Sequence, residues 1–393
     1  MSDGDTIGHR LKRIRLSRKL SLRVVAEQAG VSAGHLSRIE RGERALDRRS
    51  VTVALANALS VSPSEITSLP IPAPADGDSD GAIAAVRHAL MAVGTGHPDG
   101  QVHSAEQLRH RAAEVDRADY HLRGALYPAL IADLHTTLAQ GRIGSTDHAA
   151  LLCTAVMLYA RSLEEFLATV GASLDLRWQV SELARDAAGE LDDAMMFGLV
   201  AWSTVLIMLN GGAFDLAYRE LDATTVPTDT NEGMQLDGML ALARSLVAAS
   251  TNRPAEVSAS LRHATEVAER TGQGDAFHLG FGPVNVGLWR MAAALESGEP
   301  DETVRIAEGL RPAEHPTRER QAAYFTDYGR ALARVRRRDD AVRALRRGEL
   351  LMPLRVQRNP FARDTLAELR PYSKNDAVGR ELRGMCYRAG LPV

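Results

Sequence analysis

The sequence predicts an all-α protein in which a five-helix domain, residues 1–69, is followed by an α-solenoid, residues 83–393. No segment shows the strict alternation of apolar and polar residues that indicates a strand. The apolar content is mainly Ala, Leu and Val, which favours closely packed helices. From about residue 192, four helix pairs follow one another, each split by a short polar or glycine-containing turn. A chain of 393 residues is also too long for one compact core.

The composition is that of a soluble globular protein, with 45% apolar and 25% charged residues. The longest apolar stretch, Phe197 to Asn210, is too short to span a bilayer, and the N-terminus lacks the apolar segment of a signal peptide. We therefore expect a cytoplasmic protein that does not bind membranes. Cys153 and Cys386 are expected to be reduced thiols, and no metal or cofactor is predicted.

Charge is distributed unevenly along the chain. Residues 1–69 carry 12 Lys and Arg against 7 Asp and Glu, a net charge of +5, whereas the remainder carries −8. A basic N-terminal part on an acidic remainder is expected if only the N-terminal part meets a polyanion. Between them, residues 70–82 hold three prolines, two glycines and three aspartates, a composition that predicts a short linker.

Residues 20–42 have the pattern of two short helices joined by a tight turn. Ser21 is a good N-cap for a helix over 22–29, Gly30 can take the positive φ that ends it, and Ser32 caps a second helix over 32–41. This is the helix-turn-helix arrangement. The flanking helices are predicted at 8–19, 50–59 and from Ser62-Pro63. Their expected inward residues are Leu11, Ile14, Leu16, Val53, Ala54, Ala56 and Leu59.

Residues 6–69 resemble the Xre family, the repressor-and-Cro type of helix-turn-helix domain. The resemblance is carried by Arg10-Leu11, Leu20-Ser21, Ala26, Gly30-Val31-Ser32, Leu36-Ser37, Ile39-Glu40, Arg41-Gly42 and Ala54-Asn57-Ala58-Leu59. It implies a sequence-specific transcriptional regulator in which helix 32–41 enters the major groove of an operator.

The resemblance also implies which side chains meet DNA. Arg38 can pair bidentately with guanine, while Ser37, Ala33 and His35 can reach base edges or phosphates. Better phosphate candidates are basic residues around the motif. The full candidate set is Arg23, Ser32, Ala33, His35, Ser37, Arg38, Arg41 and Arg44. Glu40 is expected to hold an arginine in place rather than to contact DNA.

The four C-terminal helix pairs have a repeating form. Taking Ala217, Val257, Val304 and Ala341 as equivalent gives spacings of 40, 47 and 37 residues. In the last pair, the series Gly329, Ala341, Leu345, Gly348 and Pro353 resembles the tetratricopeptide pattern, with small residues where two helices cross and a closing proline. We therefore expect a tetratricopeptide-like sensor and dimerisation domain over residues 83–393.

Xre domains fused to such repeats resemble the peptide-pheromone-responsive regulators of Gram-positive bacteria. That resemblance implies a homodimer, a pseudo-palindromic operator and a signalling peptide or other small molecule held on the concave face. The first helix of each pair would line that face, which gives the candidate ligand residues Trp202, Leu206, Asn210, Asn285, Trp289, Thr326, Arg330 and Arg334. Arg330 and Arg334 could take a carboxylate bidentately.

Purely structural roles remain alternative interpretations of the same residues. A tryptophan on an apolar helix is more often core, and Asn210 beside two glycines is more often a helix end. The repeats could also serve only to oligomerise or to bind a partner protein. An enzyme is not expected, because the chain contains no GxxxxGK[ST], HExxH or GxSxG motif, and the glycines between 272 and 287 predict a loop before a helix.

Overall fold

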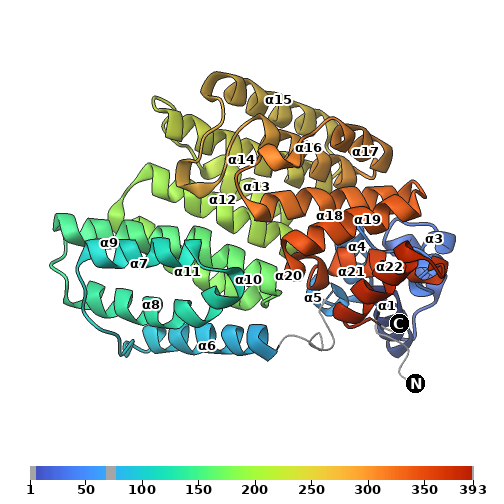
Figure 1. The fold of residues 1–393 in the computed structure, drawn as a ribbon, viewed down its shortest axis with the longest axis horizontal. Coiled ribbons are helices and arrows are strands. Elements are labelled where there is room, and N and C mark those ends of the chain that lie inside the picture. Colours follow the sequence, from blue (N-terminus) through green and yellow to red (C-terminus); the bar gives the residue numbers. More distant parts are fainter. Residues whose placement is uncertain (1–5, 68–76, 392–393) are drawn as a thin grey trace.

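Five short helices form the N-terminal part of the chain, which we call the head (residues 6–67). In the computed structural model, which describes residues 6–67 and 77–391, all the regular secondary structure is helical (Figure 1). The head helices are α1 (Ile7–Ser17), α2 (Leu22–Gln28), α3 (Ala33–Glu40), α4 (Arg49–Leu59) and α5 (Pro63–Thr67). Their shared core contains Leu11, Val25, Leu36, Ile39, Leu46, Leu55 and Leu59.

The turn between α2 and α3 follows the local rules that the sequence predicted. The hydroxyls of Ser21 and Ser32 accept hydrogen bonds from the backbone N–H groups of Val24 and His35, so each helix begins at a capped N-terminus. Gly30 has a φ of 64°, a conformation that costs little without a Cβ, and it turns the chain between the helices.

Two inward predictions in the head were wrong. Leu16 is 56% exposed, because the neighbouring Arg15 takes the inward position and is buried against Glu40. Val53 is only half-buried and lies against Gly212 of the C-terminal part rather than in the head core.

The remaining helices form the body (residues 77–391). Its first part is not divided into regular pairs and contains a long helix, α8, that is interrupted by neither its glycine nor its proline. The helices are α6 (Gly77–Gly94), α7 (Ala105–Arg117), α8 (Tyr120–Gln140), α9 (Thr146–Val156), the π-helix η1 (Met157–Leu163), α10 (Glu164–Val170) and α11 (Leu174–Leu191). Helix α6 begins inside the stretch expected to be a linker, whereas residues 70–76 lie outside the described residues.

From α12 onward the body has a helical-repeat-like arrangement of successive helix pairs. They are α12 (Ala194–Gly211) with α13 (Phe214–Ala223), α14 (Asn231–Ser250) with α15 (Pro254–Thr271), α16 (Pro283–Ser297) with α17 (Pro300–Glu308), and α18 (Arg318–Arg334) with α19 (Arg338–Leu351). Short 3₁₀ turns, η2 (Ala276–His278) and η3 (Pro312–Glu314), lie in the connections. Each pair division coincides with a turn predicted from the sequence.

Close contact between α18 and α19 depends on small residues. A Cβ at Gly329 would lie 2.7 Å from the Leu345 Cγ atom and 3.2 Å from the Ala341 carbonyl oxygen. A Cβ at Gly348 would lie 3.3 Å from the Ala322 carbonyl oxygen. The glycines therefore stand where the two helices approach most closely, as the repeat pattern predicted.

Helix α12 is longer than the apolar stretch recognised in the sequence. Its 18 residues carry no charge and have a mean hydropathy of 1.6, so by length and composition it could cross a membrane. However, 56% of this segment is buried inside the fold, where it packs against α11, α13 and α14. We describe it as a core helix of the body.

The C-terminal helices bring the body back to the head. They are α20 (Pro353–Gln357), α21 (Pro360–Leu369), the 3₁₀ turn η4 (Arg370–Tyr372) and α22 (Ala377–Arg388). Figure 1 shows α21 and α22, in red, beside the blue head helices, although these segments lie at opposite ends of the sequence. The head is thus held against the last repeat and the helices that follow it.

Candidate functional site

The outer face of α3 and the first turn of α2 form the predicted DNA-binding surface. Arg23, Ser32, Ala33, Arg38 and Arg41 are exposed, together with Gly34. His35, Ser37 and Arg44 are half-buried. The N-terminal half of α3 therefore presents little more than backbone, and its long outward side chains lie toward its C-terminal end.

The Arg38 guanidinium, on the exposed side of α3, has no protein partner among the described residues. No hydrogen bond or ion pair joins its guanidinium to any residue in the described part of the chain. By contrast, the Arg41 guanidinium donates to the Ser37 hydroxyl and, at 2.6 and 2.8 Å, to the Glu43 carboxylate. Ser37, Arg41 and Glu43 thus form a cluster of their own, whereas the Arg38 side chain is exposed beside it.

The imidazole of His35, in the first turn of α3, favours its neutral form. Burial, followed by the positive charges of Arg44 and Arg38, lowers the pKa of its imidazole. A neutral imidazole offers one donor and one acceptor at this position.

Glu40 lies inside the head, as the sequence predicted. Its two carboxylate oxygens accept hydrogen bonds from Arg15 Nε and Nη2 at 2.6 and 2.7 Å, and the same arginine donates to the Leu20 carbonyl oxygen. This bidentate pair ties α1 to the C-terminal end of α3 and so fixes the orientation of the helix that carries Arg38.

The loop between α3 and α4 is bound by the body. The backbone N–H groups of Ala45 and Leu46 donate to the carboxylates of Glu368 and Asp364, at 2.8 and 2.5 Å. From α18, Arg330 donates to the Asp47 carbonyl oxygen at 2.6 Å. Backbone groups of the head are thus satisfied by side chains of α18 and α21.

Arg334, a predicted ligand residue, takes part in the same contact between head and body. Its guanidinium bonds the carboxylates of Asp47 and Glu368 at 2.5 and 2.6 Å, and its side chain is only 2% exposed. Although burial opposes ionisation, Arg334 and Arg330 hold the pKa of Asp47 below its usual value. All three guanidinium nitrogens of Arg334 thus donate to protein oxygens, the third to the Ala45 carbonyl oxygen at 3.4 Å.

The N-terminus of α4 is capped from outside the head. Arg48 stands at the N-cap and provides no side-chain cap. Instead, the Glu296 carboxylate of α16 accepts from the backbone N–H groups of Arg49 and Ser50 at 3.1 and 3.0 Å, while the Glu296 carbonyl oxygen accepts from Arg48 Nε at 2.7 Å. A carboxylate there also interacts favourably with the helix dipole.

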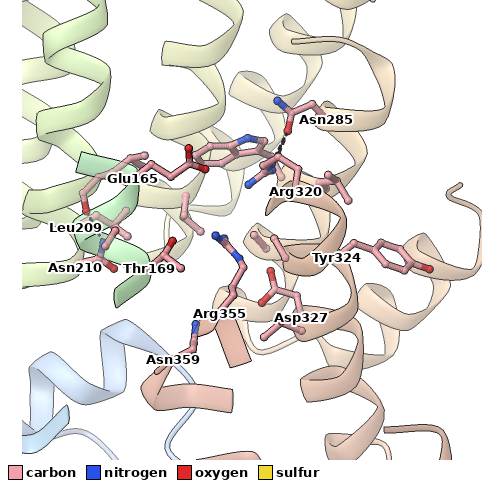
Figure 2. Close-up of a pocket in the computed structure, with 18 of the residues that line it drawn as sticks. Glu165, Thr169, Leu209, Asn210, Asn285, Arg320, Tyr324, Asp327, Arg355 and Asn359 are labelled. Atoms are coloured by element: carbon pink, nitrogen blue, oxygen red, sulfur yellow. Dashed lines mark hydrogen bonds between the residues drawn. The ribbon is translucent and has the colours of Figure 1, made fainter. Parts of the chain in front are cut away.

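A cavity of about 260 Å³ lies directly behind this contact, enclosed by first helices of the repeat pairs and by α10 and α20. Its polar wall is shown in Figure 2, where Arg355 extends from α20 into the space between Glu165, Arg320 and Asp327. Seven of the eight predicted ligand residues line it; these are Trp202, Leu206, Asn210, Asn285, Trp289, Thr326 and Arg330.

The charges around the cavity leave two arginines without a carboxylate. Arg177 is paired with Glu164, Arg161 with Glu165, Arg330 with Asp327 and Arg49 with Glu296. Those are all the acidic side chains in the wall, whereas Arg320 and Arg355 also line it. Neither forms an ion pair within the described residues.

Arg320 is positioned by neutral groups. It donates to the Asn285 Oδ1 atom at 3.1 and 2.8 Å and lies over the Trp289 ring, 5.4 Å from its centroid. Burial, followed by the charge of Arg355, lowers its pKa to about 10. Arg320 therefore remains charged at neutral pH, in an electrostatically unfavourable position beside a second cation.

Both predicted asparagines are already engaged within the protein. The buried Asn285 donates to the Leu279 carbonyl oxygen at 3.2 Å and accepts from Arg320, so it orients that arginine. Asn210 donates to the Leu206 carbonyl oxygen at 2.8 Å and accepts from Arg49 at 3.3 Å. Each amide therefore already has both a donor and an acceptor partner within the protein.

Four important residues were not predicted from the sequence. Arg320 lies on the same face of α18 as Asp327 and Arg330, so helical periodicity could have included it. Arg355 follows Pro353, outside the repeat pattern, and Arg49 and Glu296 meet only through the contact between head and body. No local signal marks such long-range partners.

Comparison with known proteins identifies one part of the chain. Residues 6–69 match a family described as a helix-turn-helix domain. Neither curated proteins nor solved structures gave a match. The match covers the head alone, and it supports a DNA-binding regulator.

Proposed function

We propose that this chain is a transcriptional regulator whose head reads an operator and whose body controls the head through a ligand in the cavity behind it. The observation that carries the proposal is the position of Glu296. This carboxylate caps α4 of the head, pairs with Arg49 and forms part of the cavity wall. Any ligand that displaces it changes how the head is held.

Other wall residues have the same double role. Arg330 lines the cavity and donates to the backbone of Asp47 in the head. The guanidiniums of Arg49 and Arg330 both lie over the Phe361 ring, 5.7 and 5.0 Å from its centroid. The head can be held against the body, which we call docked, or be released from it. A ligand that binds these two arrangements with different affinities would shift their populations.

The chemistry of the wall favours an anionic ligand with an apolar portion. Arg320 and Arg355 supply two positive charges without carboxylate partners, which suits a carboxylate or a phosphate. Leu206, Leu209, Leu288 and other apolar side chains form much of the remaining wall. The volume of about 260 Å³ is near the lower end for small-molecule sites, which favours a small molecule over a long extended peptide.

A body that only oligomerises or binds a partner protein is the competing proposal. Such a body needs a contact surface but no cavity with convergent polar groups. The cavity instead gathers two half-buried arginines, Arg320 and Arg355, that no carboxylate pairs among the described residues, which favours the ligand proposal.

We further propose that the regulator acts as a homodimer on a pseudo-palindromic operator. One head presents one α3 and can therefore cover one half-site. Two heads related by twofold symmetry would read half-sites about 34–36 Å apart. Dimers of this kind follow the commonest symmetry of soluble assemblies.

The ligand proposal is tested by recovering what the protein carries from its source cells. Full-length wild type and the double variant Arg320→Gln/Arg355→Gln are purified in parallel, denatured, and the released small molecules identified by mass spectrometry. We expect a carboxylate- or phosphate-bearing molecule from the wild type and at least a tenfold smaller amount from the variant.

A matched control carries the same charge change elsewhere. Arg262 and Arg270 are exposed on α15, and no ion pair joins them to a described residue, so Arg262→Gln/Arg270→Gln should retain the molecule. Equal recovery from all three proteins, or recovery of a partner protein alone, would contradict a ligand at Arg320 and Arg355.

A further inference from the structure

A second group of arginines lies where the recognition helix meets the body. A groove of about 380 Å³, which we call the junction groove, separates the C-terminal end of α3 from the turn between α18 and α19. Arg38 and Arg44 of the head form one side, and Arg334, Arg336 and Arg338 of the body form the other. None of the body residues was predicted to meet DNA.

The two acidic residues of the junction groove are already neutralised. Glu43 is paired with Arg41, and Glu368 with Arg334. Acidic side chains beside the turn are also engaged: Asp340 pairs with Arg337 and Arg343, and Asp339 with Lys374. The groove therefore keeps four arginines without a carboxylate partner among the described residues, namely Arg38, Arg44, Arg336 and Arg338.

Two of these arginines lie in surroundings that lack an acceptor for part of the guanidinium. The Arg44 Nε atom is buried without a hydrogen-bond acceptor, and burial together with the charge of Arg334 lowers the pKa of Arg44. Arg338 lies over the Tyr372 ring, 3.7 Å from its centroid, so its partner is an aromatic face rather than a carboxylate. Because the body as a whole carries a net negative charge, this concentration is not a general property of its surface.

The placement beside Arg38 indicates what the groove meets. A residue that reads a base edge from the major groove has the two phosphate backbones on either side of it. Arg336 is exposed at the turn, with a φ of 63° that directs the chain sharply from α18 into α19. It shares the groove with Arg38, so a duplex against α3 brings one backbone toward the body.

We propose that the body is part of the DNA interface: Arg336 and Arg338, with Arg44 of the head, bind the phosphates beside the base that Arg38 contacts. This rests on DNA binding by the head and extends it to residues outside the helix-turn-helix domain. Since the body can reach these phosphates only while the head is docked, docking and DNA affinity are linked. Release of the head would then weaken binding without any change in α3.

The test measures the salt dependence of DNA binding by the full chain. Binding to a 30-base-pair duplex of mixed sequence is followed by fluorescence anisotropy at several KCl concentrations. Each phosphate contact contributes about 0.9 to the slope of log K against log salt concentration. Arg336→Gln/Arg338→Gln should lower the slope magnitude by about 2 and weaken binding at low salt, with an unchanged preference among sequences.

The control Arg262→Gln/Arg270→Gln changes the charge of the body equally on α15 and should retain the wild-type slope. A wild-type slope for the Arg336/Arg338 variant would overturn the proposal, because the body would then make no phosphate contact. Equal loss in both double variants would also overturn it, since that indicates only a long-range effect of net charge. Absence of DNA binding by the wild type would instead refute the function of the head.

Discussion

Single residues in this protein are often defined by partners that are distant in the sequence. Ser21, Gly30 and Ser32 act through their own neighbours, and their roles could be predicted because capping and turn rules are local. Arg334 could not, because its partners Asp47 and Glu368 lie about 290 residues before it and 34 residues after it. Helical periodicity in the sequence shows which face of a helix a residue occupies, but not which part of the protein packs against that face.

Removal of Glu40 tests the pair that fixes α3. Glu40→Ala leaves the Arg15 guanidinium buried without its partner, so we expect the free energy of unfolding of the head to fall by about 3 kcal/mol. Chemical denaturation of the full chain measures this. Glu43→Ala breaks the exposed Arg41–Glu43 pair just after α3 and should leave the midpoint of chemical denaturation unchanged. Equal effects of the two substitutions would argue against a structural role for the Arg15–Glu40 pair.

Asp364 predicts a pH dependence of the contact between head and body. Burial raises its pKa to about 7 from an ordinary value of 3.8, although the Leu46 N–H and Arg334 favour the ionised form. The native state therefore binds a proton between these pH values, and this contribution to stability falls as the pH rises from about 4 to 7.

Asp364→Asn removes that titration while keeping an oxygen acceptor for the Leu46 N–H. The thermal midpoint of the variant, relative to wild type, should therefore be higher at pH 7.5 than at pH 5.5. Scanning calorimetry at both pH values gives the difference in midpoint between variant and wild type. The effects of the other titrating groups, which the two proteins share, cancel in this difference. A difference that is independent of pH would show that Asp364 stays ionised in the native state.

At the scale of whole elements, the repeat pairs were predictable because their signals are local. Polar turns at 210–215, 250–256, 297–302 and 335–340 separate the helices where expected, and Gly329 stands at a close crossing. The capping of α4 by α16 was not predictable, because Arg48 gives no sign that its helix is capped from another part of the chain. Likewise, the exposed Leu16 shows that an apolar residue does not fix the inward face when a buried arginine competes.

Two glycines predict opposite effects of the same substitution. Gly329→Ala places a Cβ against Leu345 and should lower the thermal midpoint by several degrees. Gly189→Ala, on the exposed face of α11, meets no atom within 4 Å and should stabilise the chain by about 0.5–1 kcal/mol. Thermal unfolding followed by circular dichroism distinguishes them. Stabilisation by both substitutions would mean that α18 and α19 are less closely packed than described.

At the scale of the whole molecule, the head and the body form a continuous structure rather than two independent units. The α3–α4 loop is bound by α16, α18 and α21, and the cavity shares Glu296 and Arg330 with that contact. The sequence predicted both parts and seven residues of the cavity wall, but not that the wall also holds the head. The contact between the cavity wall and the head exists only because α18 and α21 pack against the α3–α4 loop.

Glu296→Gln should release the N-terminus of α4 from the body. The substitution keeps the side-chain volume but removes the charge and one acceptor, so the amides of Arg49 and Ser50 should exchange hydrogen about tenfold faster. Exchange measured by mass spectrometry over residues 45–55 reports this, with residues 22–40 as an internal reference. The neighbouring Glu299 is exposed, and Glu299→Gln should exchange as the wild type does. Unchanged exchange in Glu296→Gln would refute the external cap.

The most direct measurement is the selection of genomic DNA fragments by the full-length protein. Wild type and Arg38→Ala are each incubated with sheared DNA from the source organism, and the bound fragments are sequenced. We expect the wild type to enrich fragments that share two short, symmetrically related half-sites, and Arg38→Ala to lose that enrichment while remaining folded and retaining weak, sequence-independent binding. Enrichment of no common sequence by the wild type, or of the same sequence by the variant, would contradict recognition of an operator through α3.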